Sequence, residues 1–305
     1  MQTVLISGAT GLIGKKLVQK LKANSHEVRT LSRNQSRNHF YWNPEKAEID
    51  EKAFENLDAI IHLAGAPISK RWTNSYKKEL YESRINSAEL LFETARKLNA
   101  PIKTFITASG VNYYGTQTTD IVFEETHSFT DDFLGRICFD LEQTAQKFET
   151  LGTRVCAIRT AAVLSPDGGM LKELIPLANK FLLSPLGSGK QILPWIHIED
   201  MVNIYIHLLE NETLSGAFNA TALQIINNRD FTFQLAKSLN KKVILPAVPG
   251  FVLKTVLGEM SSILLEGSAV SNSKIKEAGF QFKFEELSLA LANINKDSAP
   301  EEAES

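Results

Sequence analysis

TVLISGATGLIG, residues 3–14, joins a short β-branched run to a turn with glycines at three fixed positions. A helical pattern follows directly, so the stretch predicts a strand, a tight turn and a helix. Gly8 allows the turn, Gly11 lets the backbone approach a pyrophosphate, and Gly14 lets the helix pack on the strand. The free N–H groups at the helix start favour bound phosphate over an empty turn. The predicted contacts are Gly8, Thr10, Gly11, Leu12, Ile13 and Gly14.

The following residues continue this alternation of strands and helices. Continuously apolar or small runs, typical of strands buried on both faces, are separated by longer helical patterns. The alternation predicts an α/β fold with a Rossmann-type doubly wound parallel sheet. We expect strands at Thr3–Ser7, Glu27–Ser32, Asp58–Ala64, Lys103–Ser109 and Arg154–Ala161, and helices at about Leu12–Ala23, Tyr76–Asn99 and Leu134–Thr150.

The pattern changes after Ser165, where short helices broken by proline and glycine become frequent. A turn at Pro166–Gly169 leads into a helix to about Leu183, a strand is expected at Ile192–Ile198, and Asp200 can cap a helix that ends near Glu210. The predicted division is a dinucleotide-binding domain over residues 1–165, to which 192–220 returns, a smaller C-terminal α/β lobe over 166–191 and 221–294, and a disordered tail over 295–305.

The second predicted strand ends in Ser32 and Arg33. An acidic residue at this position accepts hydrogen bonds from the ribose 2′-hydroxyl of NAD, whereas an arginine pairs with a 2′-phosphate. Ser32 can add a hydrogen bond, and Arg37 is a second nearby cation. The pattern therefore favours NADP over NAD as the cofactor. It also favours a phosphate-binding role for Arg33 over that of a solvated loop cation.

Small residues end the third predicted strand. Leu63, Ala64 and Gly65 let a cofactor lie against backbone at the carboxyl edge of the sheet. His62 precedes them in an apolar strand, and we interpret it as a hydrogen-bonded core residue because it has no evident catalytic partner.

The composition excludes several classes of protein. A formal net charge of −2 provides no basic surface for nucleic acid, and two cysteines are too few for a disulfide framework. No apolar run reaches the length of a membrane helix, and no Cys/His spacing indicates a metal. Met1 leads almost directly into a strand, so no cleavable targeting segment is expected. We expect a cytoplasmic protein that acts on a small-molecule substrate.

Several segments resemble the extended short-chain dehydrogenase/reductases, and within them an atypical branch of epimerase-family proteins with a C-terminal domain of unknown function. The resemblance extends from Thr3 to about Ile294. It implies a Rossmann fold, a bound nicotinamide cofactor and oxidoreductase or epimerase chemistry; related proteins often form homodimers. The segments are GATGLIG (8–14), RWTNSYKKELYESRINSAELL (71–91), TASGVNYYG (107–115), PLGSGKQILPWIHIED (185–200) and LGEMSSILLEG (257–267).

The resemblance breaks at the catalytic residues. Typical members combine a serine, a Tyr-x-x-x-Lys pair and often an asparagine. Ser109 matches the serine, but Leu134 and Cys138 occupy the tyrosine and lysine positions, and Arg84 occupies that of the asparagine. Neither Leu134 nor Cys138 can perform that acid–base chemistry.

Other residues are candidates for the missing groups. Tyr113 and Tyr114 follow Ser109 directly, and either one of them donates a proton or both pack the loop with their hydroxyls in water. The resemblance places Arg84 and Glu79 near the cofactor cleft, where Arg84 holds a phosphate or the substrate; a surface ion pair is favoured for Glu79.

Two further segments complete the predicted site. Val163 follows the fifth strand, where the resemblance implies backbone near the nicotinamide. Residues 184–190 either meet an anionic substrate or form a plain surface loop. The favoured function is an NADP(H)-dependent oxidoreductase or epimerase-like enzyme with an unknown substrate. The alternative is a non-catalytic NADP(H) sensor or scaffold, which the missing Tyr/Lys pair supports.

Overall fold

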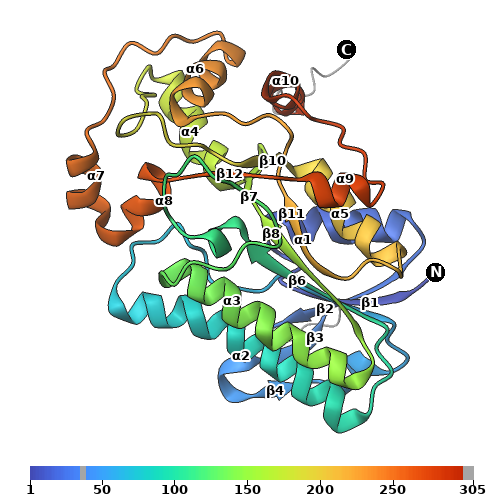
Figure 1. Ribbon diagram of the computed structural model, residues 1–305. Helices are drawn as coiled ribbons and strands as arrows, with labels where there is room; N and C mark the ends of the chain where they lie inside the picture. The colour runs from blue at the N-terminus through green and yellow to red at the C-terminus, as the bar shows by residue number, and fades with distance from the viewer. Residues whose placement is uncertain (35–38, 298–305) are drawn as a thin grey trace. The chain divides into compact units, whose positions relative to one another are not determined.

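The computed structural model describes residues 1–34 and 39–297, which form two compact units (Figure 1). The first unit comprises residues 1–115, 125–160 and 202–219, and the second comprises residues 116–124, 161–201 and 220–305. Arg37, a predicted phosphate contact, lies outside the described residues.

The first unit contains an eight-stranded sheet in the order β11-β8-β6-β5-β1-β2-β3-β4. The strand pairs from β8 to β3 are parallel, and the β3–β4 pair is antiparallel. The order reverses beside β1, which is the topology of a doubly wound Rossmann sheet and confirms the predicted fold class. The strands are β1 (Thr3–Ser7), β2 (Glu27–Ser32), β3 (Phe40–Asn43), β4 (Glu48–Ile49), β5 (Ala59–His62), β6 (Thr104–Gly110), β8 (Arg154–Thr160) and β11 (Gly216–Ala220).

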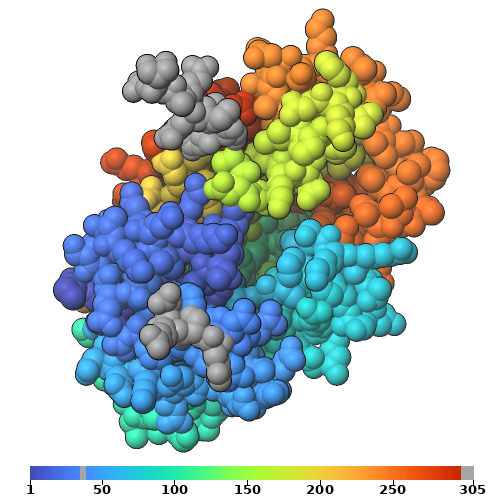
Figure 2. Space-filling view, turned by 180° about the vertical axis from the view of Figure 1, so that it is seen from behind, coloured from blue at the N-terminus to red at the C-terminus, as the bar shows by residue number. Residues whose placement is uncertain are grey.

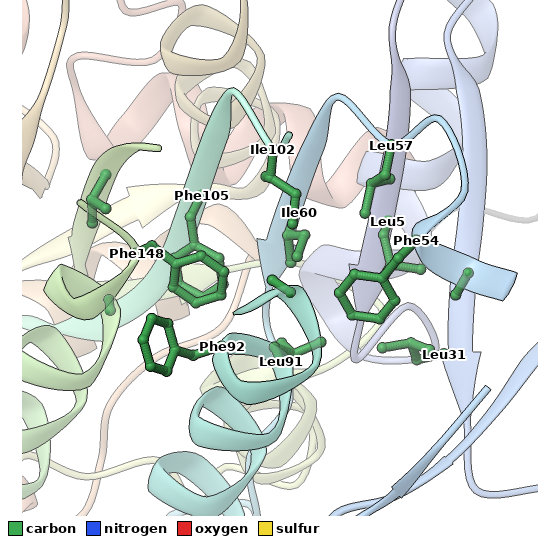
Figure 3. Close-up of a cluster of buried hydrophobic side chains, with 14 of the residues drawn as sticks. Leu5, Leu31, Phe54, Leu57, Ile60, Leu91, Phe92, Ile102, Phe105 and Phe148 are labelled. Carbon is green, nitrogen blue, oxygen red and sulfur yellow. The ribbon is translucent and has the colours of Figure 1, made fainter. Parts of the chain in front are cut away.

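Helices cover both faces of this sheet (Figure 1). They are α1 (Leu12–Ala23), α2 (Asn74–Leu98), α3 (Phe133–Gln146) and α5 (Ile198–Glu210). The strands alternate their side chains between the two faces. Paired residues Leu5, Ile60, Phe105 and Val155 form one row across four strands. This row packs against apolar residues of α2 and against Phe148 (Figure 3).

The second unit is built around short elements. Its strands pair in two parallel pairs, β9 with β10 and β7 with β12. Its strands are β7 (Val122–Phe123), β9 (Ala162–Leu164), β10 (Trp195–His197) and β12 (Ala269–Val270), and its helices are α4 (Gly169–Asn179), α6 (Asn228–Ser238), α7 (Gly250–Leu257), α8 (Ser262–Leu265), α9 (Ser273–Glu277) and α10 (Leu287–Asp297). The segment containing α7, orange in Figure 2, reaches the surface and exposes 72% of Phe251.

The structure corrects several predicted elements. The predicted helix from Leu134 to Thr150 ends as an α-helix at Gln146 and continues as a 3₁₀ turn to Leu151. The strand near Trp195 pairs with β9 in the second unit and not with the main sheet. Asp200 is not a helix cap, because α5 begins at Ile198; its carboxylate accepts hydrogen bonds from the backbone N–H groups of Lys283 and Phe284. The helix α10 extends to Asp297, inside the predicted tail.

Candidate functional site

The turn between β1 and α1 is closed by three close backbone approaches. Gly8 has φ +74°, and a Cβ there would lie 2.8 Å from the backbone of Leu63 and Ala64. A Cβ on Gly14 would lie 2.3 Å from the carbonyl oxygen of Gly8. The Gly11 N–H donates to the Gly8 carbonyl at 3.0 Å. Glycine is therefore required at positions 8 and 14 for the helix to start directly against the strand.

The start of α1 presents backbone N–H donors, because the first N–H groups of a helix have no acceptor within the helix. Gly11 is its N-cap, no side chain caps it, and the first turn contains no acidic residue. Leu12 and Ile13 supply the first backbone N–H groups of the helix, and Thr10 is exposed beside them. These groups and the helix dipole favour an anion at this end.

The end of β2 carries the residues predicted to select the cofactor. The Arg33 side chain is exposed. Ser32 is half-buried, and its hydroxyl oxygen accepts a hydrogen bond from the Asn34 N–H at 3.1 Å, so its proton is still available for donation. The parallel pairing of β1 and β2 places both residues on the same sheet edge as Gly8.

A buried network ties the end of β5 to that of β1. The Ser87 hydroxyl donates to the carbonyls of Ser83 and Arg84, so His62 Nε2 must donate to Ser87, at 3.2 Å. His62 Nδ1 then accepts from the Ser7 hydroxyl at 2.7 Å. Burial lowers the pKa of His62 to about 4. His62 is therefore a neutral core residue, as the sequence predicted.

The network continues into the predicted cofactor contacts. Ser7 Oγ accepts hydrogen bonds from the N–H groups of Leu63 and Ala64, at 3.3 and 3.4 Å. This arrangement fixes the backbone that follows β5, where Gly65 is exposed.

Arg84 of α2 lies against this same backbone. Its Nη2 donates to the Ala66 carbonyl at 2.9 Å and its Nη1 to the Leu80 carbonyl at 3.0 Å. A Cβ on Gly65 would lie 2.9 Å from the Arg84 guanidinium carbon, so the guanidinium packs on the Gly65 backbone. Glu79 is exposed on the same helix. The structure thus places Arg84 beside Gly65 and leaves Glu79 on the exposed part of α2.

Ser109 lies one residue before the end of β6 and is hydrogen-bonded to a buried ion pair. Its hydroxyl donates to Glu142 Oε1 of α3 at 2.7 Å. The Glu142 carboxylate also accepts from Arg159 of β8, at 3.0 Å from Nε and 2.8 Å from Nη2. Both ion-pair residues are buried. Because an ionised carboxylate only accepts hydrogen bonds, the Ser109 proton points toward Glu142, so the Ser109 oxygen can only accept further hydrogen bonds. The Cys138 thiol is also within hydrogen-bonding reach of the Ser109 side chain.

The structure separates the two tyrosines that follow Ser109. The Tyr114 hydroxyl is buried; it donates to Asn219 Oδ1 at 2.8 Å and accepts from Arg159 Nη1 at 2.9 Å. Burial raises the pKa of Tyr114 to about 12. Tyr113 is half-buried, and its ring lies 3.3 Å from the Arg159 guanidinium carbon. These contacts give Tyr114 a packing role and leave Tyr113 as the candidate proton donor.

The two residues that the resemblance aligns with the tyrosine and lysine are both buried. Leu134 is 5% exposed and Cys138 9% exposed. Burial raises the pKa of the Cys138 thiol to about 11, so this cysteine is a protonated core residue rather than a nucleophile. Arg136 is not a replacement for the lysine, since it forms a surface ion pair with Asp131 at 2.7 Å.

The remaining candidates lie in the second unit. Val163 is half-buried on β9 and pairs with Ile196. In the loop at 184–190, the carbonyl of Leu186 accepts two hydrogen bonds. The Gly189 N–H donates one of them, and Nε2 of the adjacent Gln191 donates the other. No cluster of three possible metal ligands occurs among residues 1–34 and 39–297.

Sequence reasoning missed Arg159 and Glu142 as members of this site. Their signal was present, because Arg159 interrupts an otherwise apolar strand and a buried cation requires a partner. The partner of Arg159 was not predictable, since Glu142 comes from another element. The partner of Tyr114 was not predictable either, since Asn219 lies 105 positions later in the sequence.

Comparison with known proteins identifies the family of this chain. Residues 4–220 match the model of the NAD dependent epimerase/dehydratase family, and residues 248–294 match a domain of unknown function, DUF1731. An epimerase family protein of Staphylococcus aureus is 35% identical over 97% of this chain and 100% of its own length. A chloroplastic SDR39U1 homolog of Arabidopsis thaliana is 37% identical over 96% of this chain and 86% of its own length.

A solved structure is also similar. The human epimerase family protein SDR39U1, crystallised with NADPH, superposes with a TM-score of 0.87 at 31% identity, over 97% of this chain and 99% of that one. No helix among the described residues is long and apolar enough to cross a membrane. The chain belongs to the NAD dependent epimerase/dehydratase family.

The buried His62 predicts a pH dependence of stability. Its folded pKa of about 4 lies below the ordinary value of 6.5, so the unfolded chain takes up the proton first as pH falls. His62 therefore destabilises the folded state progressively between pH 6.5 and 4, by about 2 kcal/mol at pH 5. Urea unfolding at pH 7 and pH 5 measures this loss, and His62→Gln should reduce it by about that amount. His207→Gln, on α5, is the matched control and should keep the wild-type loss. An unchanged loss in His62→Gln would contradict the assignment.

Proposed function

We propose that this member of the epimerase/dehydratase family binds NADP(H) along the carboxyl edge of its main sheet. The observation that carries the proposal is the β1–α1 turn, where a Cβ on Gly14 would collide with the Gly8 carbonyl and no side chain caps the start of the helix by a hydrogen bond. A helix end of this kind holds a pyrophosphate through backbone N–H groups. The similar human protein was crystallised with NADPH.

Preference for NADP(H) over NAD(H) is proposed to come from Arg33. The exposed guanidinium can form charge-assisted hydrogen bonds with a 2′-phosphate, and the Ser32 hydroxyl has a proton to donate. No carboxylate stands at these two positions to receive the 2′-hydroxyl of NAD.

The proposed activity is an oxidoreductase or epimerase reaction on a small substrate. The bound nicotinamide supplies the hydride chemistry, and the protein supplies orientation and proton handling. Ser109, with its own proton directed to Glu142, accepts a hydrogen bond from a substrate hydroxyl. Tyr113 donates or accepts the substrate proton. Arg84, fixed against Gly65, provides positive charge beside the backbone after β5.

A non-catalytic NADP(H) sensor or scaffold is the second candidate function. It is favoured by the burial of Leu134 and Cys138 at the usual tyrosine and lysine positions. A sensor requires the cofactor site but has no use for a proton donor at Tyr113.

The cofactor proposal predicts a loss of discrimination in Arg33→Ala. Removing charge-assisted bonds to a 2′-phosphate should weaken NADPH binding about 10-fold or more and leave NADH binding unchanged. Fluorescence titration of the reduced nicotinamides measures both dissociation constants. Arg96→Ala removes an exposed arginine of α2 that is already paired with Glu93, and should change neither constant. Equal weakening of NADPH and NADH binding by Arg33→Ala would refute the role of Arg33.

The catalytic proposal predicts that Tyr113 and Tyr114 differ. A screen of carbonyl and alcohol compounds with NADPH or NADP⁺ identifies a turned-over compound. Tyr113→Phe should then lower kcat about 100-fold or more without changing the NADPH dissociation constant. Tyr114→Phe removes a buried hydroxyl with two partners, so it should lower the melting temperature instead. If Tyr113→Phe turned over the compound at the wild-type rate, Tyr113 would not be the proton donor.

A further inference from the structure

Arg159 carries a buried charge and has no assigned role in the proposed reaction. Its side chain, on β8, is 4% exposed. Beyond its two bonds to Glu142, its Nη1 donates to the Tyr114 hydroxyl at 2.9 Å and to the Glu125 carbonyl at 3.3 Å. Burial lowers the pKa of Arg159, but the hydrogen bonds and charge of Glu142 outweigh this and raise it above its usual value. The guanidinium is therefore a permanent and immobile cation.

The face of this cation lies against Tyr113. The guanidinium carbon is 3.3 Å from the centre of the Tyr113 ring, well inside the range of cation–π contacts. Tyr114 and Phe129 contact the same ring edge-on, with centroids 5.5 and 6.1 Å away. Tyr113 is thus held between aromatic neighbours with a fixed positive charge on its face.

Three charged or titratable groups act on the Tyr113 phenol: Arg159 from β8, and Glu142 and Cys138 from α3. Burial raises the pKa of Tyr113, Arg159 opposes this rise, and Glu142 and Cys138 add to it more weakly than Arg159 opposes it. The cation thus keeps the phenol more acidic than its burial alone would allow.

We propose that Arg159 is a positioning residue, which orients the Tyr113 ring and supplies the positive charge that eases loss of the phenol proton. Glu142 anchors the cation and, through the same carboxylate, directs the Ser109 hydroxyl. This inference rests on the proposed proton-donor role of Tyr113.

The test is the titration of Tyr113 itself, which requires neither cofactor nor substrate. Protein labelled with ¹³C at tyrosine Cζ is titrated by NMR, and the Tyr113 signal is assigned from its absence in Tyr113→Phe. Arg159→Met should raise the pKa of Tyr113 by about 1 or more, since an opposite charge has been removed. Arg159→Lys should restore part of the wild-type value because it keeps the charge.

Two variants separate this effect from simple loss of structure. Arg159→Met leaves Glu142 buried and unpaired, so the double variant Arg159→Met/Glu142→Leu provides a folded form without either charge. Its Tyr113 pKa should still rise, by less than in the single variant. Arg154→Met is the matched control: Arg154 is on the same strand, but it bonds to Thr104 and to the Leu208 and Leu214 carbonyls. It should lower stability and leave the Tyr113 pKa unchanged.

A wild-type Tyr113 pKa in Arg159→Met and in the folded double variant would overturn the inference. NADPH titration of the same samples keeps the two proposals apart. Failure of wild-type protein to bind NADPH counts against the proposed function, whereas intact NADPH binding with a Tyr113 pKa indifferent to Arg159 counts against this inference alone.

Discussion

The candidate site depends on the contact of α1 with the carbonyl oxygen of Gly8. A Cβ on Gly14 would lie 2.3 Å from that oxygen, a distance that any other residue would have to relieve by moving the helix. The same turn brings Gly8 against the backbone that follows β5. One short glycine-rich turn therefore fixes the helix end and the exit of a neighbouring strand at once. An anion-binding position follows from this packing without any charged side chain.

Behind this turn, the site is supported by two buried polar networks with different electrostatics. The Ser7–His62–Ser87 network is neutral, and its proton positions follow from the carbonyl acceptors of Ser87. The Glu142–Arg159 network is ionised and surrounds the residues with proposed chemical roles. Buried neutral groups hold backbone in place, while a buried charge pair also sets the acidity of its neighbours. This difference is the physical basis for assigning structure to His62 and chemistry to Tyr113.

Most of the first unit was predictable because its elements are local and strongly patterned. The bounds of β1, β2 and α1 match the predicted strands and helix, since each is a continuous run ended by glycine or a polar turn. The short strands β3 and β4 were missed, because four and two residues give no measurable period. The pairing of β10 with β9 was also missed, since strand partners depend on contacts distant in sequence.

Only the site residues that belong to a sequence motif could be predicted. Gly8–Gly14 and the β2 end were named from spacing, and Ser109 was named from the family resemblance. The structure places Gly8 directly after β1, Ser32 at the end of β2 and Ser109 one residue before the end of β6. The choice between Tyr113 and Tyr114 required the partners of Tyr114, which come from β8 and β11. The central claim is that the start of α1 holds the cofactor phosphates, and hydrogen–deuterium exchange of the peptide covering residues 8–15 tests it most directly. Saturating NADPH should slow exchange of the Gly11–Gly14 amides, whereas unchanged exchange there under saturating NADPH would contradict the account.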